Sequence, residues 1–384
     1  MPRSRRPDIG VAATIAAALL LAGCGGGHDS RASTGPAGAS STNSPSSRNG
    51  QQASTTSAGS TASNSPAARA EPAGQVRIAF AGDVHFAGRT ASRLAANPAT
   101  AFGASAPVLA DADLSMVNLE TAVAVGGRPE NKSFTFQAPP SAFTALADAG
   151  VDVATMANNH GADYGSGGLS QTLAAISHSG FPVVGIGRNA AAAYAPYYRT
   201  INGVRIAIVA ASQVQDETLA HFSATDTSPG IANAYSDRLV ASVKAAKARA
   251  DIVIAYLHWG TEYQGCPNSD QRTLADTLAA AGATAVIGTH AHVLQGAGWR
   301  PDGSYVAYGL GNYLWWRSFN NAQDDNGVLT LTFAGNRVRS ARFVPSQLDN
   351  QGVSPPATGA NAQRIDAEFN QLRQCTGLLA RPTG

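Results

Sequence analysis

Side chains of the types that bind divalent cations follow five apolar segments of this chain, each at the point where the segment ends. They comprise five of the eight histidines, three acidic residues and one asparagine. In chain order they are Asp83, His85, Glu120, Asn159, His160, Asp163, His258, His290 and His292. A single histidine after a strand is more often a hydrogen-bonded turn residue. The ordered set is therefore what indicates a metal site.

The mixture of ligand types predicts two divalent metal ions. Two cations about 3.5–4 Å apart repel each other, and a shared carboxylate offsets that repulsion. Imidazoles and a carbonyl oxygen would complete each coordination shell, which favours Mn, Zn or Fe over Mg. The cluster "NNHGADYG" (158–165) also suits a plain turn, because Asn, Asp and Gly are common turn residues. Its place within the set favours a ligand-bearing loop.

Buried strands are predicted before each of these residues, with helices between them. The strand segments are "VRIAFAGD", "LSMVNLE", "VDVATMANNH", "DIVIAYLHWG" and "TAVIGTHAH". Amphipathic, mostly Ala-rich segments predict helices over 140–149, 166–179, 236–250 and 270–281. Strand–helix alternation of this kind predicts an α/β domain whose core strands are largely parallel. Such sheets place their ligands at the carboxyl ends of the strands, so the set is expected to meet at one site.

Two hairpins are predicted at the sheet edges. The segment "YYRTINGVRIAIV" turns at Asn202 and Gly203, and "VLTLTFAGNRVRSARF" turns at Gly335 and Asn336. Both dipeptides suit the primed turns whose twist matches that of the flanking strands. We therefore expect antiparallel strands at these positions.

The N-terminus has the features of a secretory signal peptide over residues 1–23. Arg3, Arg5 and Arg6 precede an apolar run over 9–22, which is too short to span a bilayer comfortably. The run ends in "LAGC", which resembles the lipobox of bacterial lipoproteins. That resemblance implies lipidation of Cys24 and anchoring to the extracytoplasmic face of a bacterial membrane in the cell envelope. An ordinary signal peptide that contains a cysteine is the alternative.

Composition divides the rest of the chain into a tether, a domain and a tail. Residues 24–74 are Ser, Gly, Thr, Ala, Asn and Pro with almost no large apolar residue, so we expect a disordered, lipid-anchored tether. Residues 75–347 are long enough to bury a full core. Residues 348–384 form a polar tail with a short helix expected over 360–375. The net charge of +2 gives no indication of nucleic-acid binding.

Cysteine usage predicts one disulfide. The chain has three cysteines, and lipidation of Cys24 would leave Cys266 and Cys375. In an oxidising compartment that pair would tie the tail to the loop after His258. Two free thiols are the alternative.

Six motifs resemble those of the CapA family of poly-γ-glutamate capsule biosynthesis proteins. They are "GDVHFAGR", "NLE", "NNHGADYG", "HWGTEY", "GTHAH" and "GLGNY". The order of the ligand types is similar to that of the calcineurin-like metallophosphoesterase superfamily. The resemblance covers residues 76–344 and implies a four-layer α/β/β/α sandwich.

The resemblance also implies a role for each residue. One metal would be held by Asp83, His85, Glu120 and His292. The other would be held by Glu120, Asn159, His258 and His290. His160 would face the substrate as general acid or transition-state stabiliser, oriented by Asp163. CapA-type chains often have a hydrophobic residue at the position of His85, and phosphoesterases commonly have an aspartate at the position of Glu120; the longer arm of Glu120 would change the metal spacing and the substrate.

Three further charged residues are candidates for parts of the site. Arg89 and Lys132 are the nearest cations for an anionic substrate, although each is equally a candidate for a solvated surface cation. Glu262 follows His258 closely and is expected to orient that imidazole or to carry a proton.

Two functions fit these observations. The first is a cell-envelope metallohydrolase acting on an anionic phosphoester or γ-glutamyl polymer in capsule synthesis, export or anchoring. The second is a non-catalytic, metal-containing factor that binds polyglutamate during export. Either function would place the chain beside membrane proteins of a capsule synthase. The pairing of His160 with Asp163 favours the first, because a purely structural metal site needs no acid.

Overall fold

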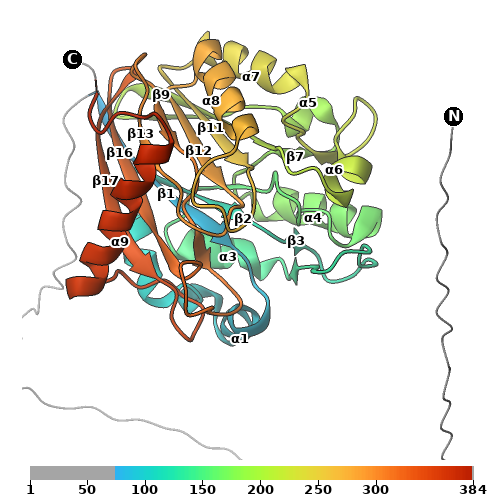
Figure 1. The fold of residues 1–384 in the computed structure, drawn as a ribbon. Coiled ribbons are helices and arrows are strands. Elements are labelled where there is room, and N and C mark those ends of the chain that lie inside the picture. Colours follow the sequence, from blue (N-terminus) through green and yellow to red (C-terminus); the bar gives the residue numbers. More distant parts are fainter. Residues whose placement is uncertain (1–73, 383–384) are drawn as a thin grey trace, which may run out of the picture. The chain divides into compact units, whose positions relative to one another are not determined.

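A computed structural model describes residues 74–382. Within these residues two mixed β-sheets pack face to face, and helices cover both outer surfaces (Figure 1). This arrangement is the predicted four-layer α/β/β/α sandwich. The expected signal peptide, Cys24 and the tether lie outside the described residues. No helix in the described range has the length and apolar character needed to cross a membrane.

The first sheet carries parallel strands at its centre and an antiparallel pair at one edge. Its order is β17 (Arg337–Gln347), β16 (Asp325–Ala334), β1 (Gln75–Val84), β2 (Leu114–Leu119), β5 (Val153–Thr155) and β6 (Val183–Val184), with β15 (Asn312–Leu314) on the end of β1. Strands β1, β2, β5 and β6 run parallel, whereas β16 and β17 are antiparallel. The carboxyl ends of β1 and β2 therefore lie side by side.

The second sheet is built in the same way. Its order is β13 (Ala297–Trp299), β14 (Tyr305–Ala307), β12 (Ala285–Thr289), β11 (Ile252–His258), β9 (Val204–Ser212) and β8 (Tyr197–Ile201). The four central strands are parallel, and both edge strands are antiparallel. Both predicted hairpins are present: Asn202 and Gly203 have positive φ in the β8–β9 turn, as does Gly335 in the β16–β17 turn. Short two-stranded ladders join β3 (Ala122–Val123) to β4 (Gln137–Ala138) and β7 (Ile186–Gly187) to β10 (Gly230–Ile231).

Four of the helices occupy the segments that periodicity predicts. They are α3 (Ser141–Asp148), α4 (Gly165–Ser179), α7 (Asp237–Lys247) and α8 (Ser269–Ala281). The capping residues explain the bounds of α8, because Asn268 and Gln271 form a capping box and Gly282 ends the helix at positive φ. The periodic pattern does not predict α1 (Gly88–Ala96), α2 (Ala106–Ala110), α5 (Ala190–Ala193) and α6 (Glu217–Phe222). Single 3₁₀ turns cover Pro98–Thr100, Gly103–Ser105 and Arg373–Cys375.

Alternation along the second sheet divides the core into two apolar layers. In β11, Ile254 and Tyr256 point towards the first sheet, where the Tyr256 hydroxyl donates a hydrogen bond to the carbonyl of Ala81. Val253 and Leu257 point the other way, into the cluster beneath α7 and α8. Because a strand exposes alternate residues to opposite faces, continuous burial of β11 requires this cover on both sides.

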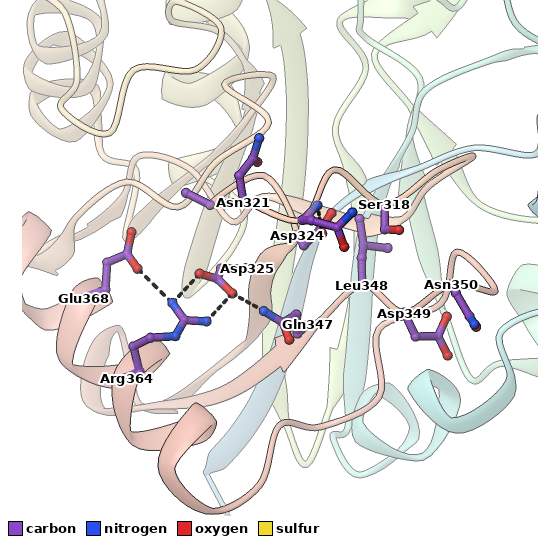
Figure 2. A pocket seen from close by; sticks show the side chains of 12 residues that line it. Ser318, Asn321, Asp324, Asp325, Gln347, Leu348, Asp349, Asn350, Arg364 and Glu368 are labelled. Carbon is purple, nitrogen blue, oxygen red and sulfur yellow. Dashed lines mark hydrogen bonds and ion pairs between the residues drawn. The ribbon is translucent and has the colours of Figure 1, made fainter.

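The tail packs back onto the first sheet through α9 (Gly359–Leu372). Arg364 makes a bidentate pair with Asp325 of β16 (2.6 and 2.7 Å), which Figure 2 shows. The ring of Phe369 stacks on Phe343 of β17 with centroids 4.0 Å apart. Beyond α9, Cys375 forms a disulfide with Cys266 in the loop after β11. The tail is therefore held by an ion pair, an aromatic contact and a covalent bond.

We expect loss of the disulfide to destabilise the fold. The two cysteines are 109 residues apart in sequence, and opening a loop of that length costs about 4–5 kcal/mol in the chain-entropy model. Urea denaturation of Cys266→Ser and Cys375→Ser variants should show this loss of unfolding free energy. The double variant should lose no more than either single variant. Equal stability of the single variants and the unaltered protein would contradict the prediction.

Candidate metal centre

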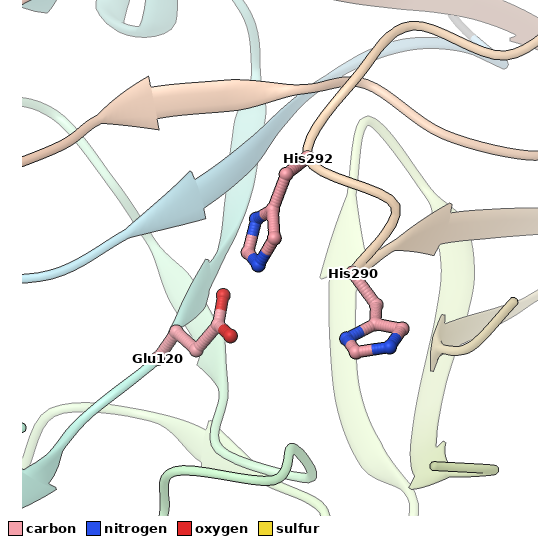
Figure 3. A group of neighbouring side chains, drawn as sticks. All are labelled: Glu120, His290 and His292. Carbon is pink, nitrogen blue, oxygen red and sulfur yellow. The ribbon is translucent and has the colours of Figure 1, made fainter. Parts of the chain in front are cut away.

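The carboxyl ends of both sheets meet at a cluster of buried carboxylates and imidazoles. Glu120, His290 and His292 offer donor atoms within 4.8 Å of one another, and Asp83, Glu120 and His258 form a second such group. Figure 3 shows the side chains of the first group facing a common space. Asp83 lies near the end of β1, Glu120 directly follows β2, and His258 ends β11. Glu120 belongs to both groups, which is the position expected of a bridging carboxylate.

The chemistry of this cluster fits bound cations. Asp83 and Glu120 are fully buried, and Glu120 Oε1 has no hydrogen-bond partner among the described residues. Burial raises the pKa of Glu120 well above its usual value, and the nearby charge of Asp83 raises it further. Burial also lowers the pKa values of His258 and His290 well below the ordinary value, so both imidazoles are neutral and can act as ligands. Divalent cations would offset the unfavourable burial of the two carboxylates.

Asn118, which the ligand pattern does not predict, joins the two carboxylates. Its Nδ2 donates to Asp83 Oδ1 (2.8 Å) and Glu120 Oε2 (3.4 Å), and it lies 3.1 Å from His258 Nδ1. Its Oδ1 accepts a hydrogen bond from Asn158 Nδ2 at 2.8 Å. The signal was present in "VNLE", because an asparagine inside an otherwise apolar strand must find a buried partner.

The remaining predicted ligands lie around the same centre. Asn159 Oδ1 is 2.8 Å from His258 Nε2, and His290 Nδ1 is 3.1 Å from the same nitrogen. His292 Nδ1 lies 2.9 Å from Asn312 Oδ1 and 3.4 Å from Asp83 Oδ2. His290 and His292 both have positive φ, a strained conformation for residues other than glycine. The fold thus keeps both histidines in a backbone conformation that such residues rarely adopt.

His85 is fully buried after β1, and its Nδ1 has no hydrogen-bond partner among the described residues. Its Nε2 accepts a hydrogen bond from the backbone N–H of Trp316 at 3.0 Å. Its ring stacks on Trp315, with centroids 4.0 Å apart and planes 6° from parallel. Among the described residues it belongs to neither donor group. In this position His85 supports the segment that carries both tryptophans.

His160 and Asp163 form a buried pair beside the two donor groups. His160 Nδ1 lies 2.5 Å from Asp163 Oδ2, and His160 Nε2 lies 3.8 Å from Glu120 Oε1. The carboxylate therefore holds one ring nitrogen and directs the other towards the metal centre. Burial lowers the pKa of His160, and the charge of Asp163 opposes that shift without reversing it.

Lys132 lies behind this pair rather than in contact with solvent. Its Nζ is 3.0 Å from Asp163 Oδ1 and 3.0 Å from Asp216 Oδ2, and it donates a hydrogen bond to the carbonyl of Asn159. Burial alone would lower the pKa of Lys132, but the charges of Asp163 and then Asp216 outweigh it and raise the pKa. Lys132 thus forms ion pairs with two carboxylates. Through Asp163 and the carbonyl of Asn159 it also holds the loop that carries His160.

A small cavity of about 70 Å³ opens over His160 and His292. We call it the mouth; its aromatic lining is Phe134, Phe136, Tyr263, Trp315, Trp316 and Phe319. Arg317 and Glu262 line it too. The side chain of Glu262 therefore lies at the mouth, whereas the ring of His258 contacts Asn118, Asn159, Thr289 and His290. Arg89 is exposed on α1 and does not belong to this lining.

The placement of His85 predicts a difference in metal content between two variants. Glu120→Gln removes the carboxylate shared by both donor groups, so we expect it to lose most of the bound metal. His85→Phe keeps an aromatic ring on Trp315 and should retain the metal. Elemental analysis of the purified proteins measures both. Loss of one metal ion per chain from His85→Phe would show instead that His85 is a ligand.

Removal of the Lys132 charge should destabilise the protein. Lys132→Met leaves the buried carboxylate of Asp163 without its cation, and breaking a buried pair in this way costs about 3–5 kcal/mol. Chemical denaturation measures the change in unfolding free energy. Lys244→Met, on the exposed surface of α7, is the matched control and should change stability little. A Lys132→Met protein as stable as this control would contradict the prediction.

Comparison with known proteins agrees with the resemblance seen in the motifs. The chain is 28% identical over 278 residues to the capsule biosynthesis protein CapA of Bacillus anthracis, which covers 70% of this chain and 66% of that protein. It is 32% identical over 199 residues to the PGA biosynthesis protein CapA of Bacillus subtilis (strain 168), which covers 50% of each. The match thus spans about half to two thirds of these relatives.

Solved structures show only a distant likeness. A hypothetical protein from Thermus thermophilus has a TM-score of 0.47 at 18% identity and covers 71% of this chain and 99% of its own. A phosphatase from Mycoplasma pneumoniae has a TM-score of 0.45 at 15% identity and covers 71% and 93%. Neither likeness supports a functional conclusion. The family model described as "Bacterial capsule synthesis protein PGA_cap" matches residues 77–315, more than half of the chain. The chain therefore belongs to this family of bacterial capsule synthesis proteins.

Proposed function

We propose that this protein is a metal-dependent hydrolase that cleaves γ-glutamyl amide bonds of a capsule polymer at the cell envelope. The observation that carries the proposal is the buried His160–Asp163 pair beside the unpartnered Glu120 oxygen. A metal site with a purely structural role needs no oriented imidazole at its edge. Family membership and the names of the two CapA relatives support the polymer as the substrate.

The residues of the site divide the work between metal binding and proton transfer. Asp83, Glu120, Asn159, His258, His290 and His292 would hold two divalent cations. When bound, such cations would polarise the scissile carbonyl oxygen as Lewis acids. His160 keeps the hydrogen on Nδ1 bonded to Asp163, so Nε2 is free to take up a proton and deliver it to the departing amine. Lys132 fixes Asp163 and therefore the direction of that imidazole.

The location and partners in this proposal come from the N-terminal segment. Lipidation of Cys24 would keep the domain at the extracytoplasmic face of the membrane, on a tether over residues 24–74. Membrane proteins of a capsule synthase would then supply or receive the polymer. A phosphoester is the other anionic substrate class that the same residues could serve.

We expect His160→Asn to reduce hydrolysis of oligo-γ-glutamate by about 100-fold or more, because general acid–base groups typically contribute that factor. The full chain in detergent would be assayed for released amine, with metal content measured on the same samples. His178→Asn, on the exposed surface of α4, is the matched control and should keep full activity.

Two other results would revise the proposal. Cleavage of a bis-aryl phosphate but of no γ-glutamyl substrate would show that the site is a phosphoesterase. Metal binding without turnover of either substrate would show that the protein is a non-catalytic, polymer-binding capsule factor.

A further inference from the structure

The mouth carries one anionic and one cationic side chain beside its aromatic walls. Glu262 lies in the loop between β11 and α8, and Arg317 lies in the segment after β15. Both side chains are exposed, and neither forms an ion pair within residues 74–382. A substrate that enters the mouth therefore meets a carboxylate and a guanidinium that are not neutralised by an ion pair within residues 74–382.

Two aromatic rings contact the guanidinium group of Arg317. Its guanidinium carbon lies 4.3 Å from the ring centroid of Trp316 and 4.7 Å from that of Phe319. The rings attract the cation electrostatically, and the guanidinium N–H groups of Arg317 donate no hydrogen bond within residues 74–382. Those N–H groups match the two oxygens of a carboxylate in a bidentate arrangement. Arg317 is thus suited to bind a planar anion such as a carboxylate.

Glu262 directly precedes Tyr263 in a loop that is fixed at two points. The backbone N–H of Tyr263 donates to the carbonyl of Ala291 at 2.7 Å, and Cys266 further along the loop is covalently tied to the tail. Burial raises the pKa of Tyr263 and the charge of Glu262 raises it further, whereas the charge of Arg317 lowers it. Both charged groups are therefore close enough to influence Tyr263, in opposite directions, and all three residues line the mouth.

We propose that the mouth recognises the amino-terminal unit of a γ-linked glutamate chain. Arg317 would bind the α-carboxylate of that unit, and Glu262 would bind its α-ammonium. Only the first unit of such a chain carries both groups, because every internal α-nitrogen is part of an amide bond. This inference rests on the proposed function and adds to it the end of the polymer at which the enzyme acts.

Recognition of the first unit implies removal of one glutamate at a time. Water adds to the γ-carbonyl carbon of the bound unit, and the bond from that carbon to the amide nitrogen breaks. The departing nitrogen takes a proton and becomes the α-amine of the next unit. The products are free glutamate and a chain one unit shorter, whose new amino terminus presents the same two groups to Arg317 and Glu262.

The test compares two γ-linked glutamate pentamers, one with a free amino terminus and one with an acetylated terminus. Binding to the metal-depleted full chain would be measured by calorimetry, which keeps the result independent of turnover. We expect the free pentamer to bind about 10–100-fold more tightly, the range of a charge-assisted hydrogen bond. Hydrolysis of both pentamers by the metal-loaded chain would be followed in parallel.

Two variants separate the contributions of the two charges. Glu262→Gln should weaken binding of the free pentamer and abolish the preference between the two. Arg317→Met keeps an apolar stem against Trp316 and should weaken both pentamers alike, because both carry the same α-carboxylate. Glu217→Gln and Arg339→Met, which are exposed away from the mouth lining, are the matched controls and should change neither affinity.

Each remaining outcome overturns the inference in a distinguishable way. Equal binding of both pentamers, or cleavage of the acetylated pentamer at the same rate, would overturn end recognition and leave the hydrolase intact. A preference that survives in Glu262→Gln would show that another group binds the ammonium. Absence of both binding and cleavage for either pentamer would overturn the polymer substrate together with this inference.

Discussion

The close burial of two carboxylates determines how the rest of this protein is arranged. Asp83 and Glu120 lie at the ends of adjacent parallel strands, fully removed from solvent and without a lysine or arginine partner in the described chain. Two such charges strongly destabilise each other unless hydrogen-bond donors and cations compensate. The first sheet supplies Asn118, and the second sheet supplies His258, His290 and His292. The candidate ligands therefore come from both sheets, which meet at this place.

The fold class could be predicted from the sequence, and so could the gathering of most candidate ligands at one place, because both depend on where strands end. Polar residues after an apolar run are visible without coordinates, and parallel pairing then brings them together. Asn312 was not predicted, since its contact with His292 depends on the pairing of β15 with β1. The contacts of His85 with Trp315 and Trp316 were not predicted either, because they depend on where the segment after β15 lies.

The short helices, and which charged side chains are buried, could not be predicted from the sequence for two other reasons. Helix α5 is a run of four alanines, which has no periodic pattern to detect. Lys132 and Arg317 are equally polar in sequence, yet one is enclosed by Asp163 and Asp216 and the other lies on two aromatic rings. The partners of Lys132 lie tens of residues away in sequence, whereas the rings beside Arg317 belong to its own segment. The sequence shows that a charged residue is present, but it does not show which residues surround that charge in the fold.

The position of Cys266, four residues after Glu262, links covalent chemistry to the geometry of the rim. The bond to Cys375 fixes the far end of the loop that carries Glu262 and Tyr263, with the backbone carbonyl of Gln264 held by Gln295 in between. A newly made chain in a reducing compartment lacks this bond, so that edge of the rim is fixed only by its hydrogen bonds. Oxidation thus fixes this edge of the rim at the same time as it stabilises the fold.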